Sequence, residues 1–250
     1  MTSTVQLKSS SWRESSGYLA LRSGLAAFAL FALVSCSSAV DGEDVESVAS
    51  QSAAPSSSPT PSTVTPEFCE PATAIGREAT PVGGPKEYLE RKKYTLTLET
   101  NCGVIEIAAD AQKAPVTVTT IGYLANAKFY DATLCQRVTT SGIFVIQCGD
   151  PTDTRAGGPG FTFKDENLPA ASESNYPKGT VAMANTGPNT NGSQFFFVYK
   201  DTTLGPNYTI WGEVIKGMDI LEKIAALGTA DGGPDGKPKF PFEIRSARLS

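Results

Sequence analysis

In the second half of the chain, the apolar residues recur with two different spacings. Some short segments alternate apolar and polar residues, as strands do, and others repeat apolar residues every three to four positions, as helices do. From 94 to 100, apolar and polar residues alternate and several are β-branched, which predicts a strand. After a short turn, 104–107 is expected to pair back as a hairpin. Pro115 suits a first helical turn and opens a predicted helix over 115–126, and 217–227 shows the apolar spacing of a second helix.

The remaining apolar segments are short and also predict strands. A second hairpin is expected from Val138 and 143–147, and single strands are expected at 181–183, 195–198, 210–214 and 244–249. A long loop rich in Gly and Pro spans 150–169. Many short antiparallel strands with only two helices predict a mainly β domain, a closed barrel capped by the helices.

One polar stretch inside this pattern contains only turn-forming residue types. Gly187 to Ser193 consists of Gly, Pro, Asn, Thr and Ser, and three adjacent phenylalanines begin at Phe195. A simple surface hairpin would need fewer constrained residues, and ordered loops on rigid scaffolds often carry binding sites. The residues alone leave a binding loop and a plain connection equally open.

Composition and charge narrow the function classes. The chain has 250 residues, 40% of them hydrophobic and 19% charged, with a net charge of −5. This acidic balance argues against a nucleic-acid partner, which requires basic patches. Because the chain has no histidine, Ser-His-Asp and Cys-His nucleophilic sites and His-ligated metal sites are excluded. We expect neither a metal nor a cofactor.

The N-terminal region has the organisation of an export signal. An uncharged apolar run of eleven residues, 24–34, follows a polar region that carries Arg13 and Arg22. The run is short for a membrane span, and it ends in Leu33-Val34-Ser35-Cys36. This ending resembles the lipobox of bacterial lipoproteins. The resemblance implies that 1–35 is removed as a signal peptide and that Cys36 is lipidated, which would anchor the protein to the extracytoplasmic face of the cell membrane.

Two other interpretations of this region remain open, a plain signal peptide and an uncleaved signal anchor. Residues 36–66 are rich in Ser, Pro and Thr and show no periodicity, so we expect a disordered tether. Residues 67–93 form an N-terminal extension to the domain. Its charged stretch 86–91 is long enough for one or two helical turns.

Four cysteines follow Cys36, namely Cys69, Cys102, Cys135 and Cys148. In an exported domain they predict two disulfides, for which three connectivities exist. Cys135 and Cys148 flank the second predicted hairpin at similar distances from its turn and so could face each other, which would leave Cys69 for Cys102. The alternative is four free buried thiols. Zinc binding is not favoured, because the chain has no Cys-x-x-Cys spacing.

The stretch 183–197, MANTGPNTNGSQFFF, resembles the signature of the cyclophilins, the peptidyl-prolyl cis-trans isomerases. The resemblance extends over about 94–250. It implies a closed antiparallel barrel of eight strands capped by two helices. It also implies that the protein acts on proline-containing polypeptides and catalyses rotation about X–Pro peptide bonds.

The resemblance also assigns site residues. The family's catalytic arginine ends a Phe-His-Arg triplet, and here the triplet is Cys135-Gln136-Arg137, so only the arginine matches. Arg137 and Gln147 are implied as catalytic residues. Thr203 stands where many eukaryotic members have the tryptophan that binds cyclosporin, so we expect weak cyclosporin binding. The implied substrate-binding residues are Phe144, Val145, Ala184, Asn185, Gln194, Phe196, Leu204 and Tyr208.

The chemistry explains why an arginine is needed. The barrier to rotation of a peptide bond is about 18–20 kcal/mol, because nitrogen shares its lone pair with the carbonyl group. Twisting the bond localises that pair on the proline nitrogen, where a donor such as Arg137 stabilises the twisted state more than the planar one. Because no proton is transferred, the absence of histidine does not oppose this mechanism.

Three functions are therefore compared. The first is a membrane-tethered isomerase that assists the folding of exported proteins. The second is a binding module, a chaperone or scaffold for proline-containing peptides, which the altered Cys135-Gln136 pair keeps open. A purely structural envelope lipoprotein explains neither the pocket residues nor the ordered loop. Nothing in the sequence indicates oligomerisation, so we expect a monomer.

Overall fold

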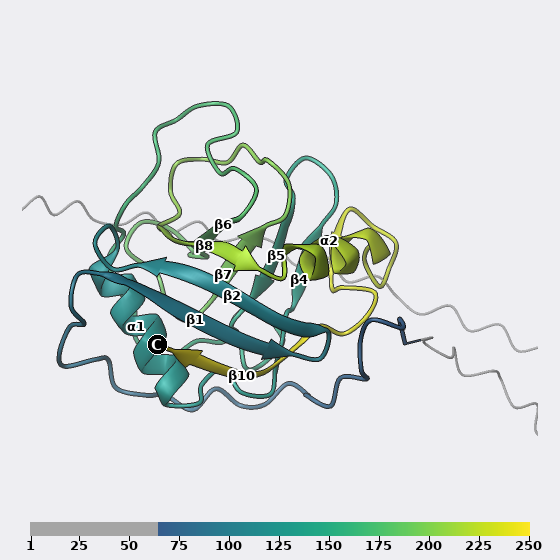
Figure 1. Ribbon diagram of the computed structural model, residues 1–250, viewed down its shortest axis with the longest axis horizontal. Helices are drawn as coiled ribbons and strands as arrows, with labels where there is room; N and C mark the ends of the chain where they lie inside the picture. The colour runs from purple at the N-terminus through teal and green to yellow at the C-terminus, as the bar shows by residue number, and fades with distance from the viewer. Residues whose placement is uncertain (1–64) are drawn as a thin grey trace, which may run out of the picture. The chain divides into compact units, whose positions relative to one another are not determined.

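The computed structural model describes residues 65–250, which form a mainly β domain with two helices (Figure 1). The predicted signal peptide, Cys36 and all but the last two residues of the predicted tether lie outside the described residues. Ten strands form one antiparallel sheet in the order β3-β10-β1-β2-β8-β6-β7-β5-β4-β9. The helices are α1 (Pro115–Asn126) and α2 (Met218–Leu227). The strands are β1 (Lys93–Thr100), β2 (Gly103–Asp110), β3 (Thr133–Leu134), β4 (Arg137–Thr139), β5 (Val145–Cys148), β6 (Thr180–Met183), β7 (Phe195–Val198), β8 (Ile210–Lys216), β9 (Asp235–Gly236) and β10 (Glu243–Leu249).

Both predicted hairpins and both predicted helices are confirmed, but the number of strands is ten rather than eight. The additional strands β3 and β9 have two residues each and no hydrophobic alternation that the sequence could display. The pairings run from β3 to β9, and closure of the sheet into a barrel stays a prediction. The stretch 86–91, which was long enough for one or two helical turns, has none.

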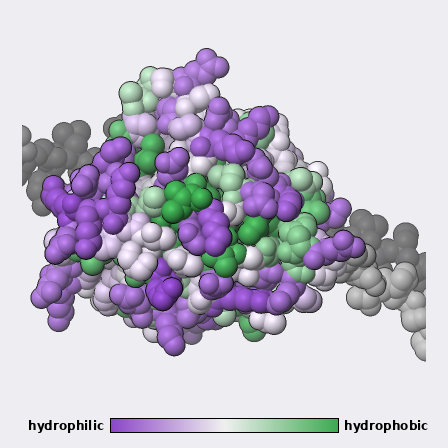
Figure 2. Space-filling model, viewed as in Figure 1, coloured by the Kyte–Doolittle hydropathy of each residue, from purple (hydrophilic) through white to green (hydrophobic). Residues whose placement is uncertain are grey.

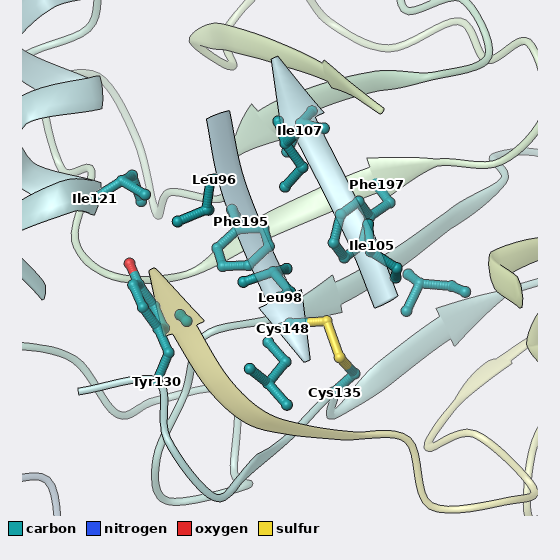
Figure 3. Close-up of a cluster of buried hydrophobic side chains, with 14 of the residues drawn as sticks. Leu96, Leu98, Ile105, Ile107, Ile121, Tyr130, Cys135, Cys148, Phe195 and Phe197 are labelled. Atoms are coloured by element: carbon teal, nitrogen blue, oxygen red, sulfur yellow. A yellow bond between two sulfur atoms is a disulfide. The ribbon is translucent and has the colours of Figure 1, made fainter. Parts of the chain in front are cut away.

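The first hairpin supplies one wall of the hydrophobic core. Leu96 and Leu98 of β1 are fully buried, and they pair in register with Ile107 and Ile105 of β2. Figure 3 shows these side chains pointing toward Phe195 and Phe197, with Ile121 of α1 beside them. The alternation that predicted the strands thus turns one face of the hairpin into the core.

The strands β5, β6 and β7 are buried on both faces. Ile146, Phe195 and Phe197 point into the main core, whereas the alternating residues Val145 and Phe196 belong to a second, smaller cluster on the opposite face. This two-sided burial explains the run of adjacent phenylalanines, because a strand covered on both faces has no polar side. The second cluster lies beneath the candidate site.

The polar loop 187–193 lies against the end of β5. Gly149 has φ +93°, and a Cβ atom there would stand 2.4 Å from the carbonyl oxygen of Ser193, so only glycine permits this contact. The Ser193 hydroxyl donates to the carbonyl of Gly149 at 2.7 Å. Next to it, the buried Asp150 carboxylate accepts hydrogen bonds from the backbone N–H groups of Thr152, Thr154 and Gly157. Asp150 thereby orders the start of the long loop.

Two disulfides join the four predicted cysteines, in the pairing that their positions indicated. Cys135 is bonded to Cys148, and both side chains are buried beside Leu98 in the main core (Figure 3). Cys69 is bonded to Cys102 in the turn between β1 and β2. The first bond connects the chain before β4 with the end of β5, and the second attaches the extension to the sheet.

The extension is held along its length by further contacts. The backbone N–H of Thr73 donates to the buried carboxylate of Glu243 at 2.8 Å, and Arg77 donates to the carbonyl of Phe129 at 2.8 Å. Farther on, the N–H of Leu89 donates to the hydroxyl of Thr119 on α1 at 3.1 Å. Together with the Cys69–Cys102 bond, these contacts hold the extension against the sheet and α1.

The face drawn in Figure 2 is covered mainly by hydrophilic residues, with hydrophobic residues in small groups. Within residues 65–250, no helix combines the length and apolar character needed to cross a membrane.

The Cys135–Cys148 bond is expected to add about 3 kcal/mol to the free energy of unfolding, because it closes a loop of similar length to those for which this value is estimated. Because reduction breaks both disulfides, urea unfolding compares the stability lost on reduction in the wild type with that lost in a variant without this bond, and the difference measures its contribution. The Cys135→Ala/Cys148→Ala double variant is the control, since it should lose only the part of the reductant effect that belongs to this bond. Equal loss of stability on reduction in the variant and the wild type would contradict the prediction.

Candidate functional site

A cavity of ≈ 110 Å³ opens where the second hydrophobic cluster reaches the surface. Strands β4, β5 and β7 supply three of its sides, and the segments after β6 and before β8 supply the rest. Its lining residues are Arg137, Ile143, Val145, Gln147, Ala184, Asn185, Phe196, Leu204 and Tyr208. Eight of these nine residues were expected in the site from sequence, all except Ile143, whereas the expected Phe144 and Gln194 do not line this cavity.

The floor of the cavity is aromatic and rigid. The rings of Phe196 and Tyr208 meet edge to face with centroids 5.5 Å apart, and Tyr176 packs behind both. The Tyr176 hydroxyl accepts a hydrogen bond from the N–H of Tyr208 at 3.0 Å. Leu204 is fixed through its backbone, since its N–H and its carbonyl both bond to the side chain of Asn175. These contacts hold the apolar wall without help from a ligand.

Phe144 does not line the cavity, and the expectation from sequence is corrected here. Successive side chains along a strand point to opposite faces. Val145 and Gln147 face the cavity, and the side chain of the preceding residue Phe144 therefore points away from it. Phe144 instead packs edge to face against Tyr199, and Ile143 takes its place at the cavity. The period of two along 143–147 would have identified Ile143 if it had been applied to the site.

Arg137 is held at the edge of the cavity by two elements that are far apart in sequence. Its Nε and Nη2 atoms donate to the two carboxylate oxygens of Asp235 in β9, at 2.9 and 2.6 Å. Its Nη1 atom donates to Oε1 of Gln147, the residue opposite it in the β4–β5 register, at 3.5 Å. Three of the five N–H groups of the guanidinium are engaged in this way, and two remain for a ligand.

The orientation of Gln147 is fixed by a chain of side-chain amides. The amide nitrogen of Gln194 donates to the backbone carbonyls of Arg155 and Gly157, at 3.0 and 2.8 Å. Because carbonyls only accept, Oε1 of Gln194 must face the other way, where it accepts from the amide nitrogens of Gln136 and Gln147, at 2.9 and 2.8 Å. Gln147 therefore presents its own oxygen to Arg137.

Gln136 completes this chain from a fully buried position. Its side chain is 0% exposed, and its Oε1 atom has no hydrogen-bond partner in the described structure. Reversing the amide would satisfy neither group, since it would place two acceptor oxygens against each other at Gln194. A buried unpaired acceptor destabilises a fold by about 1–3 kcal/mol. The Oε1 atom of Gln136 is left unpaired in this way, while its amide nitrogen keeps the hydrogen bond to Gln194.

Asp235 and Arg155 are the polar residues that sequence reasoning missed. The carboxylate of Asp235 also lies 3.5 Å from the guanidinium of Arg155, so it contacts one arginine of β4 and one of the loop after β5. The hydrogen bond from Arg137 holds the pKa of Asp235 below its usual range, and the same bond raises the pKa of Arg137 despite partial burial. Both groups therefore remain charged throughout the neutral pH range. The isolated Gly-Pro-Asp-Gly sequence gave no signal of this contact.

Asn185, Ala184 and Gln194 lie together along one rim. The side chain of Asn185 donates to the carbonyl of Asn207 at 2.8 Å, so its backbone is the part that remains for a peptide. Ala184 donates from its N–H to the carbonyl of Gln194 at 2.9 Å. Gln194 lines a neighbouring, larger cavity. Thr203 is exposed and its hydroxyl accepts a hydrogen bond from the N–H of Ser174.

The cavity can bind a small apolar ring or side chain of a ligand. The backbone of that ligand would then face the guanidinium of Arg137, a cationic donor held in place. In the part of the chain that the structure covers, no group of His, Cys, Asp or Glu side chains is placed to hold a metal ion. The chain itself supplies this site with hydrogen bonding and electrostatics, through Arg137 and the amides beside it.

Comparison with known proteins identifies relatives of the whole domain. The family model of the cyclophilin type peptidyl-prolyl cis-trans isomerases matches residues 95–249. A probable peptidyl-prolyl cis-trans isomerase B of Mycobacterium tuberculosis is 43% identical over 168 residues, which cover 63% of this chain and 54% of that protein. The corresponding protein of Mycobacterium leprae is 39% identical over 203 residues, 76% of this chain and 69% of its own length.

Solved structures give the same result. A crystal structure of a cyclophilin type peptidyl-prolyl cis-trans isomerase of Cryptosporidium parvum superposes with a TM-score of 0.55 at 27% identity, covering 63% of this chain and 98% of its own. A second structure of that protein was determined in the presence of the dipeptide Ala-Pro. Because the matched region contains the sheet, both helices and the cavity, this chain belongs to the family of cyclophilin-type peptidyl-prolyl cis-trans isomerases.

Proposed function

We propose that this protein catalyses cis-trans isomerisation of X–Pro peptide bonds in polypeptides. The observation that carries the proposal is the Arg137 guanidinium, held by Gln147 and Asp235 at the edge of a small apolar cavity. The cavity is of a size to hold a proline ring. The structure of a relative that was determined in the presence of the dipeptide Ala-Pro supports the same class of substrate.

In this mechanism the apolar wall holds the proline ring while the preceding carbonyl rotates. Val145, Phe196 and Leu204 contact the ring, and the backbone of Asn185 holds the neighbouring peptide group. As the bond twists, the lone pair localises on the proline nitrogen, and a free N–H of Arg137 donates to it. No proton is transferred and no covalent bond forms, so the chain needs no cofactor.

Asp235 determines which donors of Arg137 are available. Removing its charge would have two opposing effects, since the guanidinium would attract electrons more strongly but would also lose its bidentate partner. The pair is partly solvent-exposed, with 25% and 42% of the two side chains accessible, which weakens the long-range effect of the charge. We therefore expect loss of orientation to dominate, because misplaced catalytic groups reduce rates strongly.

We also propose that the protein acts at the extracytoplasmic face of the cell membrane, attached through a lipid on Cys36, on exported proteins as they fold. Two observations support this location. The sequence Leu33-Val34-Ser35-Cys36 ends an apolar run, and the domain contains two disulfides, which persist in oxidising compartments. The chain spans about half the length of the first curated relative, so its clients are inferred from this chain alone.

Replacing Arg137 by alanine should lower kcat/KM for isomerisation by about 100-fold, the effect of losing one preorganised donor. NMR exchange spectroscopy on a short X–Pro peptide measures the rate with the purified chain. Arg137→Lys should restore little, because a lysine ammonium lacks the planar fork that Asp235 holds. The matched control is Arg248→Ala, an exposed arginine of β10, which should keep wild-type activity.

The outcome also separates the two candidate functions. If the wild type binds the peptide but does not accelerate exchange, the domain is a proline-peptide binding module. The replacement of the family's Phe-His by Cys135-Gln136 would then be the first difference to reverse.

Asp235→Asn should lower kcat/KM by roughly tenfold, with the larger part of the loss in kcat, because the guanidinium loses its bidentate clamp. Asp235→Glu should restore part of the rate. The control is Asp153→Asn, which removes the ion pair between Asp153 and Lys237. This pair joins the two loops that also carry Arg155 and Asp235, but it does not contact Arg137. Equal losses in both asparagine variants would mean that the loops matter rather than the clamp.

Lipidation is tested by growing cells that express the full chain with a labelled fatty acid. The wild type should carry the label and sediment with membranes, whereas Cys36→Ala should do neither. Ser38→Ala, two residues away, should behave as the wild type does. Label that persists in Cys36→Ala would overturn the proposed anchor.

A further inference from the structure

A second cavity of ≈ 640 Å³ lies directly beside the first and shares Gln147, Ala184 and Asn185 with it. Its volume lies in the range of ligand sites, about 300–1,000 Å³. The smaller cavity, of ≈ 110 Å³, has room for little more than one proline ring. The larger cavity is therefore the nearest space for the rest of a bound polypeptide. One of its walls comes from the loop 155–162. A second comes from the polar loop 187–193 together with the adjoining residues Thr186 and Gln194.

The third wall comes from the N-terminal extension, through Ala79 and Pro81. These two residues lie outside residues 95–249, the region that the family model matches. This wall therefore comes from outside the region that defines the family.

The extension is fixed at both ends of this wall. The N–H of Arg77 donates to the carbonyl of Pro151 at 2.8 Å, and the N–H of Val82 donates to the carbonyl of Pro159 at 2.9 Å. The side chain of Arg77 also donates to the carbonyl of Phe129. Because these bonds bracket Ala79 and Pro81, the wall is held in place before any substrate arrives.

The opposite loop is shaped to receive the extension. Gly160 has φ +84°, and a Cβ atom there would stand 2.8 Å from Cβ of Pro81, so a larger residue would push the extension away. The lining on this side is neutral and mixed in polarity, with Phe161 beside the hydroxyls of Thr162 and Thr190. The one charged lining residue, Arg155, lies 3.5 Å from the carboxylate of Asp235.

We propose that Ala79 and Pro81 make the extension a specificity-determining part of the site, where the larger cavity takes a large uncharged side chain next to the substrate's proline. The proposal rests on the proposed isomerase function and names the substrate feature that the enzyme selects. Shape carries the choice, because the cavity offers apolar contact and hydroxyl groups, and its one charged residue, Arg155, shares the carboxylate of Asp235 with Arg137.

The test compares two substrates with the full chain. One is a nonapeptide with a central proline flanked by tyrosines, and the other is the same peptide with glycines in place of the tyrosines. The wild type should prefer the tyrosine peptide, and Ala79→Trp, which fills the cavity, should reduce the ratio of the two kcat/KM values about tenfold. NMR exchange gives both rates.

The matched control is Ala74→Trp, since Ala74 lies in the same extension and is also partly buried but does not line the cavity. It should leave the ratio at the wild-type value. An equal loss for both peptides in Ala79→Trp, or an unchanged ratio, would overturn the proposal.

Failure of the isomerase function is recognised separately. If the wild type accelerates exchange of neither peptide, the dissociation constants of the two peptides replace the rates. If the wild type then binds the tyrosine peptide more tightly and Ala79→Trp removes this preference, the proposed role of Ala79 and Pro81 in specificity is still supported. If the wild type shows no such preference, that role is rejected.

Discussion

The site depends on the burial of β5 and β7 on both faces. One face of each strand completes the main core with Ile146, Phe195 and Phe197, and the other supplies Val145 and Phe196 to the cavity. A shift of one residue in either strand would exchange its core-facing and cavity-facing residues, and a shift of β5 would also turn Gln147 away from Arg137. The packing of the core and the geometry of the site are therefore fixed by the same register.

The polar part of the site is fixed by a different constraint, the direction of its hydrogen bonds. Two backbone carbonyls of the loop 155–157 determine how Gln194 is oriented, and Gln194 in turn determines how Gln147 is oriented. Gln136 stands where the related family has histidine, and it enters this chain as a second donor. An amide has no ionisation in the neutral range, so this network keeps its direction where a histidine would titrate.

The N-terminal extension connects these parts to a segment outside the common domain. The Cys69–Cys102 bond fixes its start, and its contacts with Pro151 and Pro159 fix the middle next to the larger cavity. The Cys135–Cys148 bond joins a residue two positions before β4 to the last residue of β5, one residue beyond Gln147. Covalent bonds thus hold both the extension and the β4–β5 hairpin that carries Arg137 and Gln147, which suits a protein proposed to work outside the cytoplasm.

The sequence by itself determined the elements with strong local signals. Alternation gave the β1–β2 hairpin, Pro115 gave the start of α1, and the positions of four cysteines gave both disulfides. Resemblance to the cyclophilins located Arg137 and most of the cavity.

Only the tertiary structure decided which residues meet across long separations in the chain. It placed Asp235 against Arg137 and Ala79 beside the cavity, because these contacts join loops that carry no periodic pattern. It also replaced Phe144 by Ile143, since the side of a strand that faces a cavity is set by its neighbours in the sheet. Local propensity acts over a few residues, whereas the partners of a charged or lining side chain are chosen by packing of the whole domain.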